Sequence, residues 1–144
     1  MDHVAIMNKS FGFLEKIISG EKSIESRWYL TKRIPWDRIK NGDKVYFKNS
    51  GEPISVSTKV DKVLQFMNLT PTKVKNLLLK YGKRLGLESR SNSSYYKLFK
   101  DKKYCILVFL KDVERIDEPF NIDKKGFGIM SAWISAKSIK EIHV

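Results

Sequence analysis

Cysteine and histidine are nearly missing from this chain of 144 residues, which has one cysteine, Cys105, and two histidines, His3 and His143. A single cysteine cannot form an internal disulfide, and its place in an apolar run is typical of a small buried side chain. Three such residues are too few for a zinc cluster. The Gly126-Phe127-Gly128 segment lacks the continuation of a phosphate loop. We therefore expect no metal site and no cofactor.

Long hydrophobic runs are missing as well. No apolar run approaches the roughly 20 residues that a membrane-spanning helix needs, and the N-terminus lacks the basic and apolar parts of a signal peptide. We therefore expect a soluble, cytoplasmic protein with no membrane partner. The length suits a single domain, residues 1–144, with a sizeable core.

Acidic residues are scarce relative to basic ones, 16 against 28, which gives a net charge of +12. Such an excess favours a polyanionic partner, above all nucleic acid. Ten basic and two acidic residues lie between Thr70 and Lys103, so +8 of the charge belongs to this stretch. A lysine-rich solvated surface is the alternative. The candidate contacts to a nucleic-acid backbone are Lys73, Lys75, Lys80, Lys83, Arg84, Lys97 and Lys100.

The charged segment Gly20 to Arg27 is the best candidate for a site. A helical pattern ends at Gly20, and a short strand follows in which alternation places Glu25 and Arg27 side by side on one face. Lys22 can lean over the same face. Two cations around one carboxylate would keep it ionised and leave a cation for an anionic ligand. A surface ion pair on an edge strand is the alternative.

The periodicity of the chain indicates a mixed but mainly β structure. We expect a first strand over His3–Met7, a helix capped by Ser10 and running to Ser19, a strand over Ile54–Phe66, and a last strand over Met130–Ile134. The run from Tyr104 to Leu110 is apolar on both faces, as in a central strand. Two basic helices are expected between Thr70 and Lys103. The predicted core comprises Val45, Phe47, Val56, Val60, Leu64, Ile106 and Val108.

Three ordered pieces of sequence resemble the ASCH domain of the PUA-like superfamily. They are the Gly-x-Lys-x-x-Glu-x-Arg motif from Gly20 to Arg27, the proline-aromatic turn from Ile34 to Ile39, and Gly42-Asp43 before a strand. The closing segment from Gly126 to Ile134 resembles the end of such domains. The resemblance implies an α+β, mainly β fold, a small closed β-barrel with flanking helices, here with a basic two-helix insertion. It also implies a cleft that binds RNA or a nucleotide.

Within such a cleft we expect Lys22 and Arg27 to hold a phosphate or a polar base edge. Glu25 would orient Arg27 and accept a base amino proton. A tryptophan would stack on the base, although burial of each tryptophan in the core is the alternative. The ligand-binding candidates are Lys22, Ser23, Glu25, Arg27, Trp28, Tyr29, Lys48 and Trp133.

Catalysis is the second hypothesis. Some small ASCH proteins resemble amidohydrolases of acetylated cytidine that use the motif lysine, a threonine nucleophile and a carboxylate, and others are ribonucleases. Lys22 matches the lysine, but Glu25 stands at the threonine position and Ser23 is out of register. The first hypothesis is therefore an RNA- or nucleotide-binding module. The alternative is a hydrolase of modified nucleosides, or a ribonuclease, with Lys22 and Glu25 as catalytic residues. A structural domain that awaits a protein partner is the third hypothesis.

Overall fold

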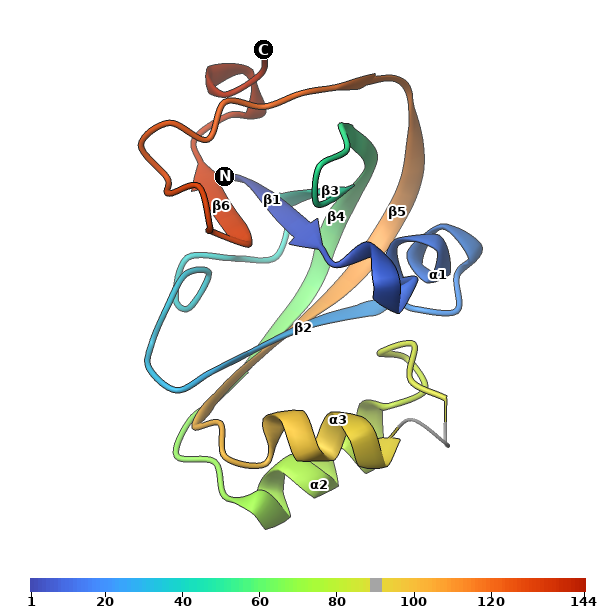
Figure 1. Ribbon diagram of the computed structural model, residues 1–144, viewed down its shortest axis with the longest axis vertical. Coiled ribbons are helices and arrows are strands. Elements are labelled where there is room, and N and C mark those ends of the chain that lie inside the picture. Colours follow the sequence, from blue (N-terminus) through green and yellow to red (C-terminus); the bar gives the residue numbers. More distant parts are fainter. Residues whose placement is uncertain (89–91) are drawn as a thin grey trace.

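The computed structural model describes residues 1–88 and 92–144, and its main element is a strongly curled sheet of six strands (Figure 1). The strand order is β2-β5-β4-β3-β1-β6, with β1 and β3 parallel and every other neighbouring pair antiparallel. The strands are β1 (Asp2–Met7), β2 (Ile24–Tyr29), β3 (Lys44–Asn49), β4 (Ile54–Phe66), β5 (Tyr104–Phe120) and β6 (Trp133–Ala136). The helices are α1 (Phe13–Ser19), α2 (Pro71–Tyr81) and α3 (Asn92–Phe99), with 3-10 turns at Lys9–Phe11 and Ile139–Glu141.

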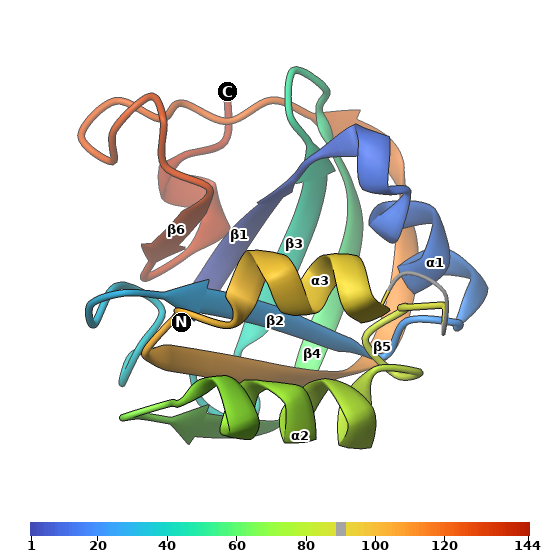
Figure 2. The same ribbon diagram turned by 60° about the horizontal axis from the view of Figure 1, so that its bottom comes forward.

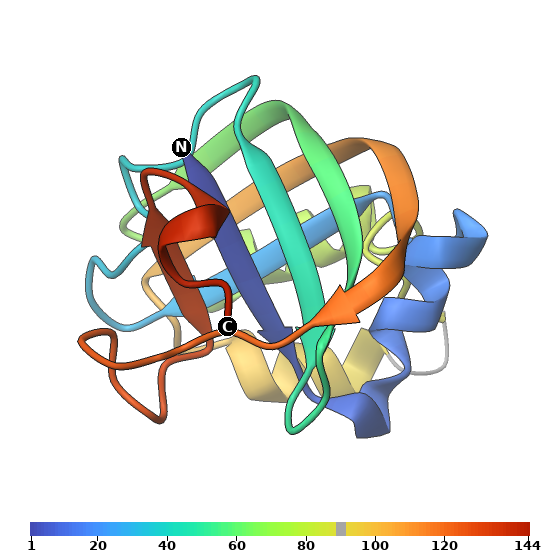
Figure 3. The ribbon, with the colours of Figure 1, turned by 90° about the horizontal axis from the view of Figure 1, so that it is seen from above.

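The sheet is an open barrel rather than a closed one, because β2 and β6 form its two edges and do not pair with each other. Seen from above, the strands wrap around one interior (Figure 3). The mainly β class predicted from the sequence is confirmed, and the closed barrel is corrected to a curled sheet. None of the helices in the described part of the chain has the length and hydrophobicity that a membrane crossing requires.

The interior of the barrel contains six of the seven predicted core residues, and Leu64 is the exception. Leu64 packs instead in a second cluster, beneath α2 and α3. Three register shifts between β4 and β5 explain the difference, the last of them between Val60 and Lys62. A bulge adds a residue to one strand and so reverses which face the later side chains occupy. After this bulge it is Val63 that packs against the interior.

The first part of β5, up to Leu110, is buried on both faces, as the sequence of Tyr104 to Leu110 predicts, and the rest of the strand is mostly exposed. Ile106 and Val108 point into the barrel, whereas Cys105 and Leu107 join the second cluster. Figure 2 shows α2 and α3 beside β2 and β5, and their apolar faces cover this outer side of the sheet. Burial raises the pKa of the Cys105 thiol well above its ordinary value. The positions of α2 and α3 also confirm the two helices that the sequence predicts for the insertion.

Two element boundaries differ from the sequence prediction. Asn8, not Ser10, caps the first turn by accepting the Ser10 N–H, and α1 begins only after Gly12, which has a φ of 67°. Glycine has no Cβ, so it adopts this left-handed conformation without a steric penalty. The last strand begins at Trp133 and not at Met130. These shifts place Phe11 at the edge of α1 and leave Met130 in a loop.

Candidate ligand-binding cleft

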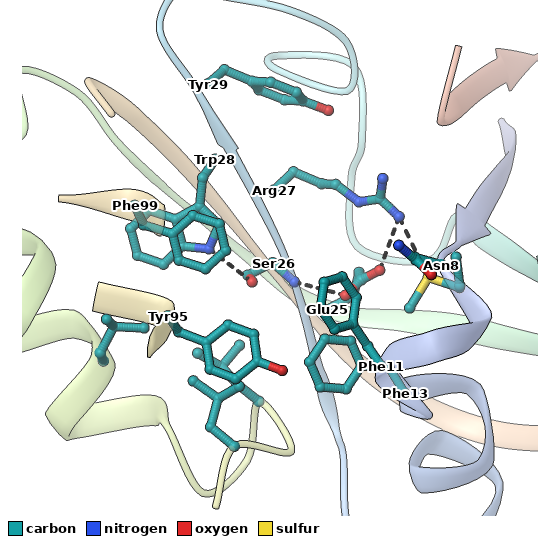
Figure 4. Close-up of a pocket in the computed structure, with 14 residues that line it drawn as sticks. Asn8, Phe11, Phe13, Glu25, Ser26, Arg27, Trp28, Tyr29, Tyr95 and Phe99 are labelled. Atoms are coloured by element: carbon teal, nitrogen blue, oxygen red, sulfur yellow. Dashed lines mark hydrogen bonds and ion pairs between the residues drawn. The ribbon is translucent and has the colours of Figure 1, made fainter. Parts of the chain in front are cut away.

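A cavity of about 290 Å³ opens between β2, the turn before α1, and the helices α2 and α3 (Figure 4). Aromatic and polar side chains occupy different parts of its lining, and we call it the aromatic cleft. Its aromatic lining residues are Phe11, Phe13, Trp28, Tyr29, Tyr95 and Phe99, and its polar ones are Asn8, Glu25, Ser26 and Arg27. Four of the predicted site residues, Glu25, Arg27, Trp28 and Tyr29, are therefore brought together.

Glu25 is the centre of a buried ion trio at the base of this cleft. Its side chain accepts from Lys22 Nζ at 3.3 Å and from Arg27 Nη2 at 3.0 Å, and Glu25 as a whole is 3% exposed. Burial alone would raise the pKa of Glu25, but the two cations outweigh it and hold the pKa below its ordinary value. The carboxylate is consequently an acceptor at neutral pH, as the sequence predicts.

Lys22 does not offer a free cation in an open cleft, so that part of the prediction is wrong. It is 2% exposed, and besides Glu25 it donates to the carbonyl oxygens of Ile24 at 2.7 Å and Leu85 at 2.8 Å. Three partners occupy the three hydrogens of an ammonium group. The segment that follows α2 covers Lys22 so closely that a Cβ on Gly86 would lie 3.1 Å from the Lys22 Cβ. Burial lowers the pKa of Lys22.

Arg27 crosses the gap between the two edges of the sheet. Its Nη1 donates to the carbonyl oxygen of Ala132 at 3.3 Å, just before β6, and its Nη2 lies 3.5 Å from Met7 Sδ. The guanidinium lies 5.2 Å from the ring centre of Trp133. Its Nε is buried and has no hydrogen-bond partner within the described residues. Nη1 carries two hydrogens and donates one of them to Ala132, so Arg27 retains donor capacity for a ligand.

The aromatic part of the cleft comes largely from residues that sequence reasoning did not assign to the site. Phe11 and Phe13 stack at 5.6 Å, and Tyr95 lies 5.9 Å from Phe13, so α1 and α3 contribute facing rings. Trp28 stacks on Phe99 at 4.8 Å with planes 7° apart. The density of aromatics at residues 95–99 is the sequence signal that could have pointed here. Asn8 and Ser26 were also missed.

The remaining predicted residues lie outside this cleft. The Ser23 hydroxyl accepts from Arg84 Nε at 2.9 Å, and Lys48 projects from β3 near Lys124. Trp133 is buried beneath Arg27 and so is not an open stacking platform. The seven predicted backbone-binding cations are exposed on the insertion, but none of them lines the aromatic cleft. Their contact with phosphate stays a prediction.

A polar network fixes Trp133 from behind. The indole N–H donates to His3 Nδ1 at 3.2 Å, Ser135 Oγ lies 2.8 Å from the same nitrogen, and His3 Nε2 contacts Asp43 at 2.9 Å. An Nδ1 that accepts from an indole must be unprotonated, so His3 is neutral with its proton on Nε2. Burial lowers the pKa of His3 more than Asp43 raises it.

This network predicts a pH dependence of stability. His3 binds a proton less readily in the folded than in the unfolded chain, whose histidine has a pKa of about 6.5. Its contribution is therefore complete above that pH and is lost as the pH falls toward the lower folded pKa. His3→Gln is expected to flatten the decline in unfolding free energy between about pH 7 and 5, measured by urea denaturation. His143→Gln, at an exposed position, is the control, and equal slopes for both variants would contradict the prediction.

Comparison with solved structures identifies the fold. The ASCH protein from Zymomonas mobilis matches with a TM-score of 0.67 and 19% identity, covering 97% of this chain and 91% of that one. A mutant of an ASCH protein from the same organism matches with a TM-score of 0.67 and 18% identity, covering 97% of this chain and 93% of that one. The hypothetical protein PH0355 matches with a TM-score of 0.52 and 23% identity, covering 81% of this chain and 100% of that one. No protein-family model and no curated protein matches the sequence. The chain therefore has the ASCH-type fold that its motif spacing predicts.

Proposed function

We propose that this protein is a nucleotide- or RNA-binding module that holds one unpaired base in the aromatic cleft. The observation that carries the proposal is the position of an ionised carboxylate and an arginine next to facing aromatic rings. Proteins that recognise single-stranded nucleic acids stack bases on aromatic side chains and read their edges by hydrogen bonds. The volume of about 290 Å³ is close to the lower end of small-molecule pockets, about 300–1,000 Å³, which suits one base and not a duplex.

The polar groups of the cleft can distinguish bases by their edges. A carboxylate has about four lone-pair sites, and Glu25 uses three of them, for Lys22, the Ser26 N–H and Arg27. The fourth is available to an exocyclic amino group. The Arg27 donors are suited to a carbonyl oxygen or a phosphate. Lys22, in this proposal, does not touch the ligand but holds Glu25 in its ionised state.

The geometry favours binding over the hydrolase alternative. Ser23 faces Arg84, outside the aromatic cleft, and Ser26 accepts a hydrogen bond from the Trp28 indole at 2.9 Å. Lys22, the expected catalytic lysine, is enclosed by backbone carbonyl groups. A nucleophile needs an adjacent base that can accept its proton, and neither serine is paired with one in the described residues. The structural domain without a ligand is disfavoured by the cleft itself, which places the Glu25 carboxylate and Arg27 among aromatic rings.

Tyr95→Ala is expected to weaken the binding of nucleosides and nucleotides by about 5- to 150-fold, the effect of removing one base-stacking ring. Binding can be measured by isothermal titration calorimetry against a panel that includes amino-bearing and amino-free bases, together with acetylated cytidine. Tyr96→Ala is the matched control, because Tyr96 lies on the same helix but lines a different cavity. Arg27→Met should lower the affinity for nucleosides and nucleotides while all aromatic rings of the cleft remain.

Two results would overturn this function. One is a panel in which no nucleoside or nucleotide binds at millimolar concentration. The other is an equal loss of affinity in the Tyr95→Ala and Tyr96→Ala variants, which would place the ligand away from the aromatic cleft. Turnover of acetylated cytidine or of labelled RNA would favour the hydrolase alternative.

A further inference from the structure

A second cavity, of about 410 Å³, adjoins the aromatic cleft. The two cavities share Met7 and Asn8, at the end of β1. Arg27 hydrogen-bonds Met7 and Ala132, and both of these residues line the second cavity. The guanidinium therefore lies at the boundary between the two cavities. The lining of the second one comprises Ile6, Met7, Asn8, Ser50, Lys124, Ile129, Met130, Ser131 and Ala132.

One cation, Lys124, lines the second cavity, and a second one, Lys48, lies near it. Lys48 is the register partner of Ile6 in the parallel β1–β3 pair, so both side chains leave the same face of the sheet, and Ile6 lines the cavity. Lys124 lines it directly and donates to the carbonyl oxygens of Ile129 and Ser131, which leaves one of its three N–H groups. Burial lowers the pKa of Lys48, and the nearby Lys124 charge lowers it further. An anion between two repelling ammonium groups would relieve that repulsion.

The loop beside these cations carries apolar side chains that the fold does not use. Ile129 is 86% exposed and Met130 is 93% exposed, so neither contributes appreciable buried area to the core. Both line the second cavity. Asn8 accepts two hydrogen bonds from Ser10 with its Oδ1, and its amide nitrogen supplies donors at the junction of the two cavities. The second cavity thus combines a cation, an amide donor and an apolar wall, with the second cation, Lys48, nearby.

We propose that the second cavity binds the backbone phosphate and the adjoining nucleotide of a single strand whose base occupies the aromatic cleft. This inference rests on the proposed function and makes a strand, not a free nucleoside, the preferred ligand. The strand passes over Arg27. Lys48 and Lys124 contact its phosphate, and Ile129 and Met130 pack against the neighbouring base. A negatively charged lipid surface is the other partner that a basic, apolar loop could attract, and binding to lipid vesicles separates the two.

Binding of a nucleoside and of single-stranded trinucleotides should be compared by calorimetry in the wild-type protein and in Lys48→Met. The trinucleotide is expected to bind more tightly than the nucleoside. Lys48→Met should weaken trinucleotide binding about tenfold, the effect of removing one charge-assisted hydrogen bond, and leave nucleoside binding unchanged. The slope of log K against log salt should fall in magnitude by about 0.7 for each phosphate that the variant no longer neutralises. Lys44→Met is the control, because Lys44 is an exposed residue at the other end of β3.

Each failure has its own signature. If nucleosides bind through Tyr95 but the trinucleotide binds no more tightly, or binds equally well to Lys48→Met, the second-cavity inference is overturned and the proposed function stands. If neither probe binds, both are overturned. A variant with Ile129→Ser and Met130→Ser should also weaken trinucleotide binding. If it instead abolishes binding to phosphatidylserine vesicles and leaves the trinucleotide affinity unchanged, the loop is a membrane contact and the inference is wrong.

Discussion

Replacing Glu25 by alanine is expected to lower the free energy of unfolding by about 3–5 kcal/mol, the cost of leaving a buried partner charge uncompensated. Lys22 would lose its carboxylate while remaining 2% exposed, and Arg27 would lose its hydrogen bond to the same group. Urea denaturation monitored by tryptophan fluorescence measures the change. The effect should also be visible as a large fall in Tm.

The structural reason for this expectation is the connection that Lys22 makes. Its ammonium joins the β2 carboxylate to the Leu85 carbonyl, which follows α2, so the trio helps to hold the insertion onto the sheet. Combining Lys22→Met with Glu25→Gln should recover much of the stability, since the buried cation is removed together with the carboxylate and the amide can still accept from Arg27. The sequence predicts that Lys22 contacts a ligand, whereas its burial indicates a role in stability.

An exposed ion pair supplies the control for this prediction. Lys9 and Glu52 approach to 2.6 Å, closer than either pair in the trio, but both side chains are open to solvent. Solvent screening makes such pairs weak. Glu52→Ala should therefore change stability very little. A Glu25→Ala variant that was no less stable than Glu52→Ala would show that the buried trio does not stabilise the fold.

Local patterns predicted much of the sheet because they depend on residues close in the sequence. The alternation over Ile54–Phe66 predicted the bounds of β4 that the structure shows, and the apolar run after Tyr104 marked a strand buried on both faces. The pairing of Glu25 with Arg27 also followed from strand alternation alone. What alternation could not show is a bulge, so Leu64 was assigned to the wrong side of the sheet.

The composition of the cleft was harder to predict, because it depends on contacts between distant segments. Phe13 and Tyr95 meet only when the insertion folds back onto the sheet, and no local period relates them. The same return of the chain brings Leu85 and Gly86 over Lys22 and turns an expected surface cation into a buried one. Charge counting identified the insertion as basic. It could not show that aromatic residues of the insertion line the cleft, whereas its seven candidate phosphate-contacting cations do not.

Trp28→Ala is expected to be the other strongly destabilising change, at about 3–5 kcal/mol for the removal of a buried aromatic side chain. Trp28 is 8% exposed and packs in the cluster that joins β2 and β5 to α2 and α3. Its ring stacks on Phe99, so its removal should loosen α3 in particular. Urea denaturation gives the stability, and hydrogen exchange of the α3 amides tests the local effect.

Milder substitutions separate anchoring of α3 from base stacking. Trp28→Phe keeps an aromatic ring against Phe99 and removes the smaller ring of the indole with the N–H that donates to Ser26, so its stability should lie well above that of Trp28→Ala. Trp36→Ala removes a half-buried indole that meets Tyr104 edge-on, outside the aromatic cleft, and should cost less. Protection of α3 that stays at the wild-type level in Trp28→Ala would contradict the anchoring role. If α3 protection is lost in Trp28→Ala, a loss of nucleotide binding in that variant follows from displacement of Tyr95, which α3 carries. Loss of binding in a well-folded Trp28→Phe would instead show that the indole itself contacts the base.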